Sequence, residues 1–282
     1  MSLRTLSLIR VVPLCAATLL LAACGKDTGP LQTNDSAFAW HGVVPAGTTL
    51  HVRELQGSID VVPSTSDTLR VTARTEWRRG DPAADLTFSA SQDSAGVLVC
   101  AIWGEGQCNK ESSNATVRFG RRFGGHATDA KVFFRVELPT GVLLDLANIN
   151  GDISAVASAP VRARTMNGSV RIVTAVGPVR AETMNGSVDV RMSSISGTDS
   201  VIAKTLNGDA FVYIPDGIDA TLDMAVTNGS LSTEFPVGAT GAVDQKHLRA
   251  TLGMGTHPIL IKSLNGEVAL RRLDAEGKSA RP

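Results

Sequence analysis

Apolar and polar residues alternate with a period of two through much of the second half of the chain. The alternation occurs in three near-copies, which read V-R-A-R-T-M-N-G-S-V-R-I over residues 161–172, V-R-A-E-T-M-N-G-S-V-D-V over 179–190 and V-I-A-K-T-L-N-G-D-A-F-V over 201–212. A period of two is the signature of a half-buried β-strand. Because the alternation stops at each Asn-Gly pair and then resumes, each copy predicts a strand, a corner and a second strand.

Asn-Gly pairs mark the predicted corners, and successive pairs lie 17, 18, 22, 21 and 37 residues apart. Gly adopts a positive φ without a Cβ penalty, and Asn does so at a small cost. We therefore expect a left-handed backbone at the asparagine as well as at the glycine of each corner. The predicted corners are Asn150-Gly151, Asn167-Gly168, Asn185-Gly186, Asn207-Gly208, Asn228-Gly229 and Asn265-Gly266.

Two architectures fit a repeated strand, corner and strand. An antiparallel meander would use Asn-Gly as its two-residue hairpin turn, whereas a solenoid would use it as one corner of a coil. The near-identity of Val161, Val179 and Val201 favours the solenoid, because in-register stacking at about 4.8 Å per coil selects like residues. We predict an all-β, β-solenoid-like fold of stacked β-strand repeats of about 17–22 residues, with a ladder of asparagine side chains along one edge.

The alternating pattern also sets the domain boundaries. A β-strand-repeat domain is predicted over residues 37–271, beginning with a copy whose corner has Gln in place of Asn. Residues 76–130 lose the period and contain clusters of Gly, Ser, Asp and Asn, which predicts a loop-rich insertion. The long interval before the last Asn-Gly pair predicts that a glycine bend at residues 252–255 replaces one corner. Residues 272–282 are polar, and we expect a disordered tail.

The N-terminus has the features of a lipoprotein signal peptide. Residues 1–23 combine two arginines with an apolar stretch too short for a permanent transmembrane helix, and they end in L-A-A directly before Cys24. This order resembles the lipobox of bacterial lipoproteins, in which the cysteine carries the acyl chains. The resemblance implies lipidation of Cys24, a flexible tether over residues 24–36 and a location in the cell envelope. Because Gly25 rather than Asp follows the cysteine, it favours the outer membrane.

Composition and charge narrow the possible functions. Removal of residues 1–23 takes away two arginines and no acids, which leaves 25 basic and 27 acidic side chains and a net charge of −2. That balance gives no electrostatic footprint for nucleic acid. The five histidines are scattered without metal-ligand spacing, and no phosphate loop or nucleophile elbow occurs. We therefore expect no cofactor and no metal.

Two cysteines remain for the folded domain. Cys15 leaves with the signal peptide and Cys24 is acylated, so Cys100 and Cys108 are left. An exported chain most simply joins such a pair in a disulfide that closes a short loop. A redox-active pair would have C-x-x-C spacing, which these cysteines lack.

The repeated pattern T-[ML]-N-G-[SD]-[VA] follows R-V-E-L-P-T-G at residues 135–141. Together they resemble the bacterial "putative adhesin" family of β-strand repeats, which is related to the toastrack-type domains of cell-envelope proteins. The resemblance covers about residues 40–271 and is most specific between Val136 and Ile214. It implies a β-solenoid-like fold and an envelope location. The family has no established catalytic residues, so none is carried over.

Two functional hypotheses follow. The first is a non-enzymatic, lipid-anchored envelope protein whose repeats form a scaffold or an adhesin-like binding module. Its partners would be the membrane, reached through the lipid, and another envelope protein or a polysaccharide. The second is a carbohydrate-active β-helix enzyme, which needs two carboxylates within about 5–9.5 Å of each other. Its candidate acids lie in the insertion: Asp81, Asp85, Asp93, Glu105 and Glu111.

Acids that follow the corners do not qualify as a catalytic pair. Asp152 and Asp209 would lie three coils apart, which is about 14 Å, and we expect them to satisfy backbone groups of the corner instead.

Two further sets of residues have more than one interpretation. Met166, Met184 and Leu206, with Ile149 and Leu264, precede the corners. They either fold inwards as a corner core, which the sequence favours, or form an exposed apolar stripe for a partner. The arginines at 162, 164, 171, 180 and 191 are expected to form a solvated face, because Glu182 and Asp189 among them weaken the case for a polyanion-binding groove.

The lipid anchor gives the first testable prediction. Replacing Cys24 by Ser should move the protein from the membrane fraction to the soluble fraction, because serine lacks the thiol to which the lipid is attached. Immunoblotting of fractions after detergent phase partitioning measures this. Unchanged partitioning of the Cys24→Ser variant would contradict the assignment of the lipobox.

Overall fold

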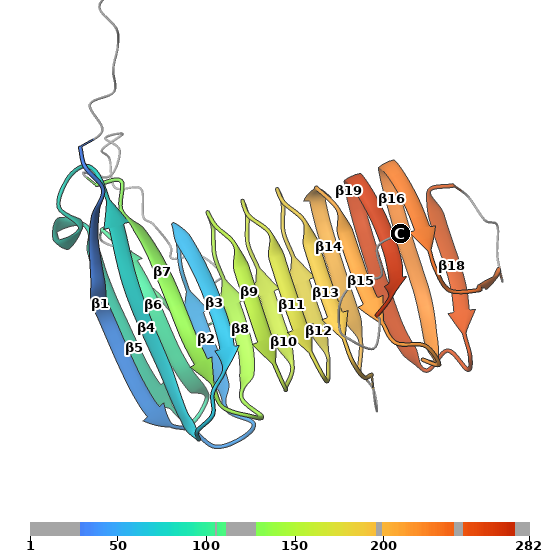
Figure 1. Ribbon diagram of the computed structural model, residues 1–282, viewed down its shortest axis with the longest axis horizontal. Coiled ribbons are helices and arrows are strands. Elements are labelled where there is room, and N and C mark those ends of the chain that lie inside the picture. The colour runs from blue at the N-terminus through green and yellow to red at the C-terminus, as the bar shows by residue number, and fades with distance from the viewer. Residues whose placement is uncertain (1–28, 105, 111–127, 196–198, 240–244, 274–282) are drawn as a thin grey trace, which may run out of the picture.

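The computed structural model describes residues 29–104, 106–110, 128–195, 199–239 and 245–273. They form a rod of stacked β-coils whose strands run across its long axis (Figure 1). The all-β, solenoid-like fold expected from the alternation is confirmed. None of the described residues belongs to a helix long and apolar enough to cross a bilayer. The signal peptide, Cys24 and the end of the tail lie outside the described residues.

The described part of the chain contains nineteen strands and one short 3-10 helix. In chain order they are β1 (Gln32–Val43), β2 (Thr49–Arg53), β3 (Gly57–Pro63), β4 (Thr68–Trp77), η1 (Pro82–Ala84), β5 (Leu86–Asp93), β6 (Gly96–Trp103), β7 (Lys131–Leu138), β8 (Leu143–Ala147), β9 (Ile153–Ala157), β10 (Val161–Arg164), β11 (Val170–Thr174), β12 (Val179–Glu182), β13 (Val188–Met192), β14 (Val201–Asn207), β15 (Ala210–Ile214), β16 (Ala220–Thr233), β17 (Gly238–Ala239), β18 (His247–Leu252) and β19 (His257–Arg272).

Each coil contributes one strand to each of two parallel sheets. The first sheet runs in spatial order through β6, β2, β8, β10, β12, β14 and the first halves of β19 and β16. The second sheet runs through β7, β3, β9, β11, β13, β15 and the second halves of β19 and β16. The inward side chains of both sheets pack in one apolar core that extends along the rod.

Like residues stack in register, as the near-identical copies predicted. Val161 pairs with Val179, and Val179 pairs with Val201, always in parallel. All three are at most 2% exposed. Because each of these side chains packs against its equivalent in the neighbouring coils, a change of volume in one coil disturbs the next. The repetition of the sequence is therefore a consequence of the packing.

The C-terminal end of the rod departs from chain order. β19 lies between the coil of β14 and β15 and the strand β16, so the last strand in the sequence is inserted before the end of the stack. The expectation that a glycine bend replaces a corner of one long coil was wrong. Residues 252–255 do turn, but they lie at the end of β18, an antiparallel strand between β16 and the short β17. The extra residues between the last two Asn-Gly pairs form β17 and β18. The spacing of the corners gives no information about these strands.

The N-terminal end is more regular than its composition indicated. β2 and β3 form a coil that lies between β6 and β7 on one side and β8 and β9 on the other. Antiparallel strands β1, β4 and β5 lie beyond it. Residues 76–130 thus include the hairpin of β5 and β6 in addition to loops. β1 begins at Gln32, opposite Trp77, so the expectation of a tether over residues 24–36, with the repeat domain starting at residue 37, was wrong for residues 32–36.

Close approach of successive coils fixes the glycine of each corner. Gly186 has a φ of 142°, and a Cβ on it would lie 2.1 Å from the carbonyl oxygen of Gly168 in the preceding coil. The hydroxyl of Thr205 in the following coil donates a hydrogen bond of 2.8 Å to the carbonyl oxygen of Gly186. Thr165 and Thr183 make the same contact in their own coils. The constant spacing of Thr and Gly within the repeat therefore serves the close contact between successive coils at the corner.

The corner asparagines act through their side chains. The amide nitrogen of Asn185 donates to Oδ1 of Asn167 over 2.8 Å, and Asn207 donates to Asn185 over the same distance. The ladder continues across the reordered end, where Asn265 donates to Asn207 and Asn228 donates to Asn265. No described residue other than glycine has a positive φ, so the expectation of a left-handed backbone at asparagine was wrong. Only the glycine of each corner adopts a positive φ, and the asparagine side chain links neighbouring coils by a hydrogen bond.

The first corner in the chain has a different chemistry. Gln56 takes the place of asparagine and pairs with Asn150. Oε1 of Glu54 accepts a hydrogen bond of 2.7 Å from the backbone N–H of Gln56, and Glu54 is only 4% exposed. Burial raises the pKa of Glu54 to about 8, because a charged carboxylate is poorly solvated there. Glu54 is therefore protonated in the folded protein at neutral pH.

The close approach at the corner predicts the effect of a single methyl group. Gly186→Ala should destabilise the protein by about 2–5 kcal/mol, because the added Cβ meets a backbone carbonyl and also opposes the positive φ. Gly47→Ala is the matched control, since Gly47 has a φ of 86° but nothing within 4 Å of an added Cβ. Gly47→Ala should lower the free energy of unfolding by only about 1 kcal/mol. Equal losses in denaturant unfolding of the two variants would show that contact between coils does not fix the glycine.

The buried Glu54 predicts how stability depends on pH. From its ordinary pKa of 4.5 up to about 8, the carboxyl ionises in the unfolded chain but stays protonated in the folded one. Rising pH in this window therefore lowers the free energy of unfolding, by at most about 1.4 kcal/mol per pH unit. Glu54→Gln cannot ionise, so its Tm should fall less than that of the natural protein between pH 5 and pH 8. Parallel pH profiles of Tm would contradict this assignment.

Candidate functional site

The outer face of the first sheet carries side chains in rows that run along the rod. The strands pair in register, so outward residues of one coil are aligned with those of the next. Because every second residue of a strand points outward, each coil adds one member to each row. Three surfaces result: the apolar row (Leu143, Pro160 and Pro178), the basic band (Arg162, Arg164, Arg180, Lys204 and Lys262) and the Met/Leu ridge (Met166, Met184, Leu206 and Leu264).

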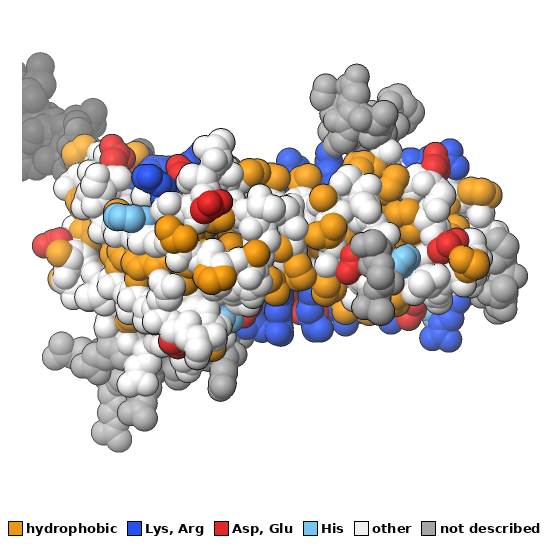
Figure 2. Space-filling model, turned by 90° about the horizontal axis from the view of Figure 1, so that it is seen from below, with side chains coloured by type: hydrophobic (Ala, Val, Ile, Leu, Met, Phe, Trp, Pro, Cys, Tyr) orange, Lys and Arg blue, Asp and Glu red, His pale blue; other side chains and the backbone are white. Residues whose placement is uncertain are grey.

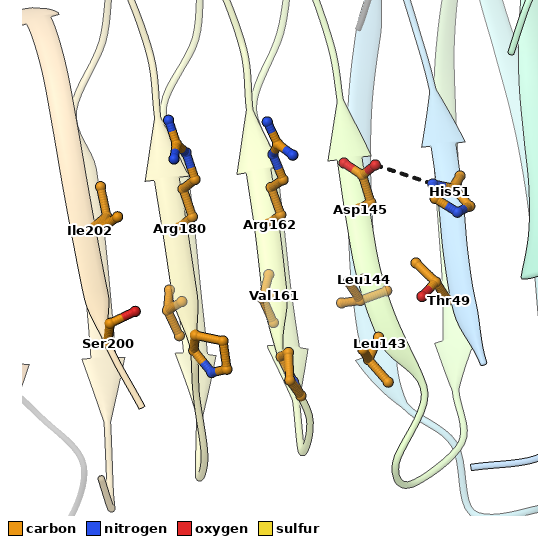
Figure 3. A pocket seen from close by; sticks show the side chains of 13 residues that line it. Thr49, His51, Leu143, Leu144, Asp145, Val161, Arg162, Arg180, Ser200 and Ile202 are labelled. Carbon is orange, nitrogen blue, oxygen red and sulfur yellow. Dashed lines mark hydrogen bonds and ion pairs between the residues drawn. The ribbon is translucent and has the colours of Figure 1, made fainter. Parts of the chain in front are cut away.

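An open trough lies between the apolar row and the nearest residues of the basic band (Figure 3). It has a volume of about 380 Å³ and extends across β2, β8, β10, β12 and the start of β14. Thr49 and Ser200 lie at its two ends, and the guanidinium groups of Arg162 and Arg180 project from adjacent strands beside it. The trough therefore runs along the rod and crosses the strands, so equivalent positions of several coils line it.

The basic band consists of two register rows. Arg162 pairs with Arg180 in the row nearer the trough. Arg164 begins the second row, which passes through Glu182 and Lys204 to Lys262. Figure 2 shows the same relation along one edge of the rod, where hydrophobic side chains run lengthwise and Lys and Arg side chains project along one side. Burial lowers the pKa of Arg164, and the neighbouring Arg162 lowers it further, as expected where cations are crowded.

A buried ion pair lies beside one end of the trough. Arg53 is only 2% exposed, and its Nη2 lies 2.8 Å from Oδ2 of Asp145. Nδ1 of His51 lies 3.1 Å from the same oxygen (Figure 3). Burial alone would raise the pKa of Asp145, but the hydrogen bond from His51 and the charge of Arg53 lower it to about 2. Asp145 is therefore ionised and already neutralised by Arg53, which fixes its carboxylate in place.

The disulfide supports this end of the site. Cys100 and Cys108 are joined, with their Cα atoms 6.4 Å apart. The bridge ties the segment that carries Lys110 to β6. The backbone carbonyl of Lys110 accepts a hydrogen bond of 2.7 Å from Nη2 of Arg53. The crosslinked segment thus satisfies a buried guanidinium that would otherwise lack an acceptor on that side.

The second sheet presents a different surface. Arg171 and Arg191 lie on β11 and β13 and so point away from the first sheet. Nε of Arg191 is 2.9 Å from Oδ1 of Asp189, and its guanidinium lies 4.8 Å from the ring centroid of Tyr213. The expectation of one solvated face formed by all five arginines was wrong, because strands on both sides of the corner contribute them. Asp189, which had weakened the case for a polyanion groove, is on the opposite sheet from the basic band.

The exposure of the Met/Leu ridge decides between the corner core and the exposed apolar stripe that the sequence allowed. Met166, Met184, Leu206 and Leu264 are between 39% and 45% exposed. They do not fold into a corner core, because the inward position beside each is occupied by Thr or Ser that bonds the glycine carbonyl of the neighbouring coil. Of the five residues considered from the sequence, Ile149 is half-buried. The ridge is an exposed apolar stripe.

Two of the carboxylates named for the enzyme hypothesis, Asp85 and Asp93, are held apart by the length of β5. Asp85 precedes β5 and Asp93 ends it, so they are separated by about 26 Å of extended strand. Asp81 caps η1 by accepting a hydrogen bond from the N–H of Ala83. Asp93 pairs with Lys110. Glu105 and Glu111 lie outside the described residues. Within the described parts of the chain, no group of three or more His, Cys, Asp or Glu side chains is arranged to hold a metal.

The acids after the corners have the structural role expected for them. Oδ1 of Asp152 accepts a hydrogen bond of 2.7 Å from the N–H of Ser169, and Oδ1 of Asp209 accepts one of 2.8 Å from the N–H of Glu267. Both bonds join adjacent coils.

Sequence reasoning missed several residues in and beside the trough. Arg53 occurs in the atypical first copy, so nothing in the period marked it as the partner of Asp145. Lys262 joined the band only because β19 is inserted beside β14. A usable signal did exist for Pro160 and Pro178, which precede the aligned valines of two successive copies.

Comparisons with known proteins find distant structural similarity. No protein-family model and no curated protein matches the chain. A solved structure described as a "putative cell adhesion protein" from Clostridium sporogenes is similar over 83% of this chain and 99% of its own, with a TM-score of 0.43 and 10% identity. A "putative adhesin" from Bacteroides fragilis is similar over 86% of this chain and 97% of its own, with a TM-score of 0.28 and 10% identity. Similarity at this level carries no argument about ligand or activity.

Proposed function

We propose that this chain is a non-enzymatic protein of the cell envelope, anchored in the outer membrane by a lipid on Cys24, whose solenoid serves as a binding module or scaffold. The observation that carries the proposal is the repetition of outward side chains on the first sheet. The trough, the basic band and the Met/Leu ridge each extend over successive coils. A partner that is itself extended meets the same contact several times, so its affinity accumulates from individually weak contacts.

The burial of the ionisable groups supports a binding role. Arg53 and Asp145, the most enclosed charges beside the trough, are paired with each other at 2.8 Å. A catalytic acid or base would instead need a proton to exchange with substrate near neutral pH, and the pKa of Asp145 is lowered to about 2. Glu54, whose pKa is raised, is buried and does not line the trough. These groups hold the shape of the surface and do not exchange protons at it.

A retention experiment tests the proposed function. The mature lipidated protein, purified in detergent and immobilised on beads, should retain a component of a detergent-solubilised envelope preparation. That component should be recovered with its chain length unchanged, because the surface holds a partner without cleaving it. Pull-down followed by size-exclusion chromatography of the released material measures both properties. Beads that carry an unrelated lipoprotein are the control. Shortened products would identify an enzyme, and the absence of retention would contradict a binding role.

A further inference from the structure

The basic band holds more positive charge than the neighbouring acids neutralise. Asp145 is on the same face but is paired with the buried Arg53. Glu182 lies within the band but is 2.8 Å from Arg180. Lys262 lies 3.3 Å from Asp223. The cations of the band that have no carboxylate of the described residues within ion-pair distance are Arg162, Arg164 and Lys204.

The cations lie at whole multiples of one coil step along the rod. Arg164, Lys204 and Lys262 occupy one register row, with Glu182 between the first two. Adjacent strands lie about 4.8 Å apart, so the row from β10 to β19 spans three coil steps, about 14 Å. One coil step is close to the length of one sugar residue in an extended glycan. A glycan that lay along the rod would therefore present one residue to each coil.

The trough beside the band suits a charged chain better than a neutral one. Its lining includes Leu143, Pro160, Pro178 and the imidazole of His51 but no Phe, Tyr or Trp side chain. Neutral sugars are held largely by stacking on such aromatic rings, so a neutral glycan would gain little here. A carboxylate, in contrast, gains charge-assisted and bidentate hydrogen bonds from a guanidinium.

We propose that the first sheet binds a linear acidic polysaccharide, a chain of uronate residues that lies along the trough with its carboxylates towards the basic band. This inference rests on the binding function proposed above and names the class of its ligand. Arg162 and Arg180 contact the part of the chain in the trough, and Arg164 and Lys204 extend the contact along the rod. The sugar rings lie over the apolar row. The paired Arg53 and Asp145 shape the end of the trough.

Titration with one polymer in two charge states tests the proposal. The full mature protein is titrated calorimetrically with polygalacturonate, and with the same polymer after methyl esterification, which removes the charge and keeps the chain. Arg162→Gln/Arg164→Gln/Lys204→Gln should weaken binding of polygalacturonate by about tenfold or more. The matched control is Lys131→Gln/Arg135→Gln/Arg171→Gln, which removes the same charge from β7 and β11 of the second sheet and should change the Kd by less than about twofold. All six side chains point outward, and Tm measurements check that both variants fold.

Each outcome decides the proposal. Binding that is lost on esterification and in the first variant supports it. Equal binding of the esterified polymer, equal loss in the two variants or no binding of polygalacturonate would overturn it. So would binding of phosphatidylglycerol vesicles alone, which would assign the band to a membrane surface. The retention experiment distinguishes the two levels: if the first variant still retains the envelope component, the binding function stands and the acidic glycan is the wrong ligand.

Discussion

Contact between the backbones of successive coils at the Asn-Gly corner is the constraint on which the rest of the structure depends. At each Asn-Gly corner the glycine lies against the carbonyl of the corner glycine in a neighbouring coil, at a distance that no Cβ would allow. Thr or Ser then donates to that carbonyl, and Asn donates to the Asn of the neighbouring coil. Three residue types in a fixed order therefore lock adjacent coils in register. With register fixed, the inward valines and alanines stack into a continuous core, and the outward residues align without further help.

Alignment of the outward residues turns a short repeat into an extended surface. The coil of β10 offers one proline and two basic residues on this face, and the next coils offer fewer, which is too little for specific recognition. Stacked in register, the same positions form a trough with a basic band beside it and an exposed Met/Leu ridge. The functional properties of the first sheet thus arise from the packing of the corner, several residues away. The buried pair of Arg53 and Asp145 adds shape at one end, where the repeat is least regular.

Antiparallel strands border the parallel coils at both ends of the rod. β18 flanks β16 at one end, and β1, β4 and β5 extend beyond the coils at the other. At each end a coil is placed out of chain order, so that β19 lies inside β16 and β2 lies inside β6. A parallel coil with its last edge open would offer unpaired N–H and C=O groups to other chains. The irregular segments of the sequence are the ones that supply these end strands.

The sequence by itself determined the strand pairs, the corners, the stacking of Val161, Val179 and Val201 and the division of inward and outward positions, because each follows from local period and from like residues at equal spacing. It also placed Arg162, Arg164 and Arg180 outside the core. Only the tertiary structure decided which sheet each arginine belongs to, that Lys262 completes the row begun by Arg164, and that Arg53 neutralises Asp145. These facts depend on strand order and on contacts between segments far apart in the chain. A period of two records which way a side chain points and contains nothing about which coil becomes its neighbour.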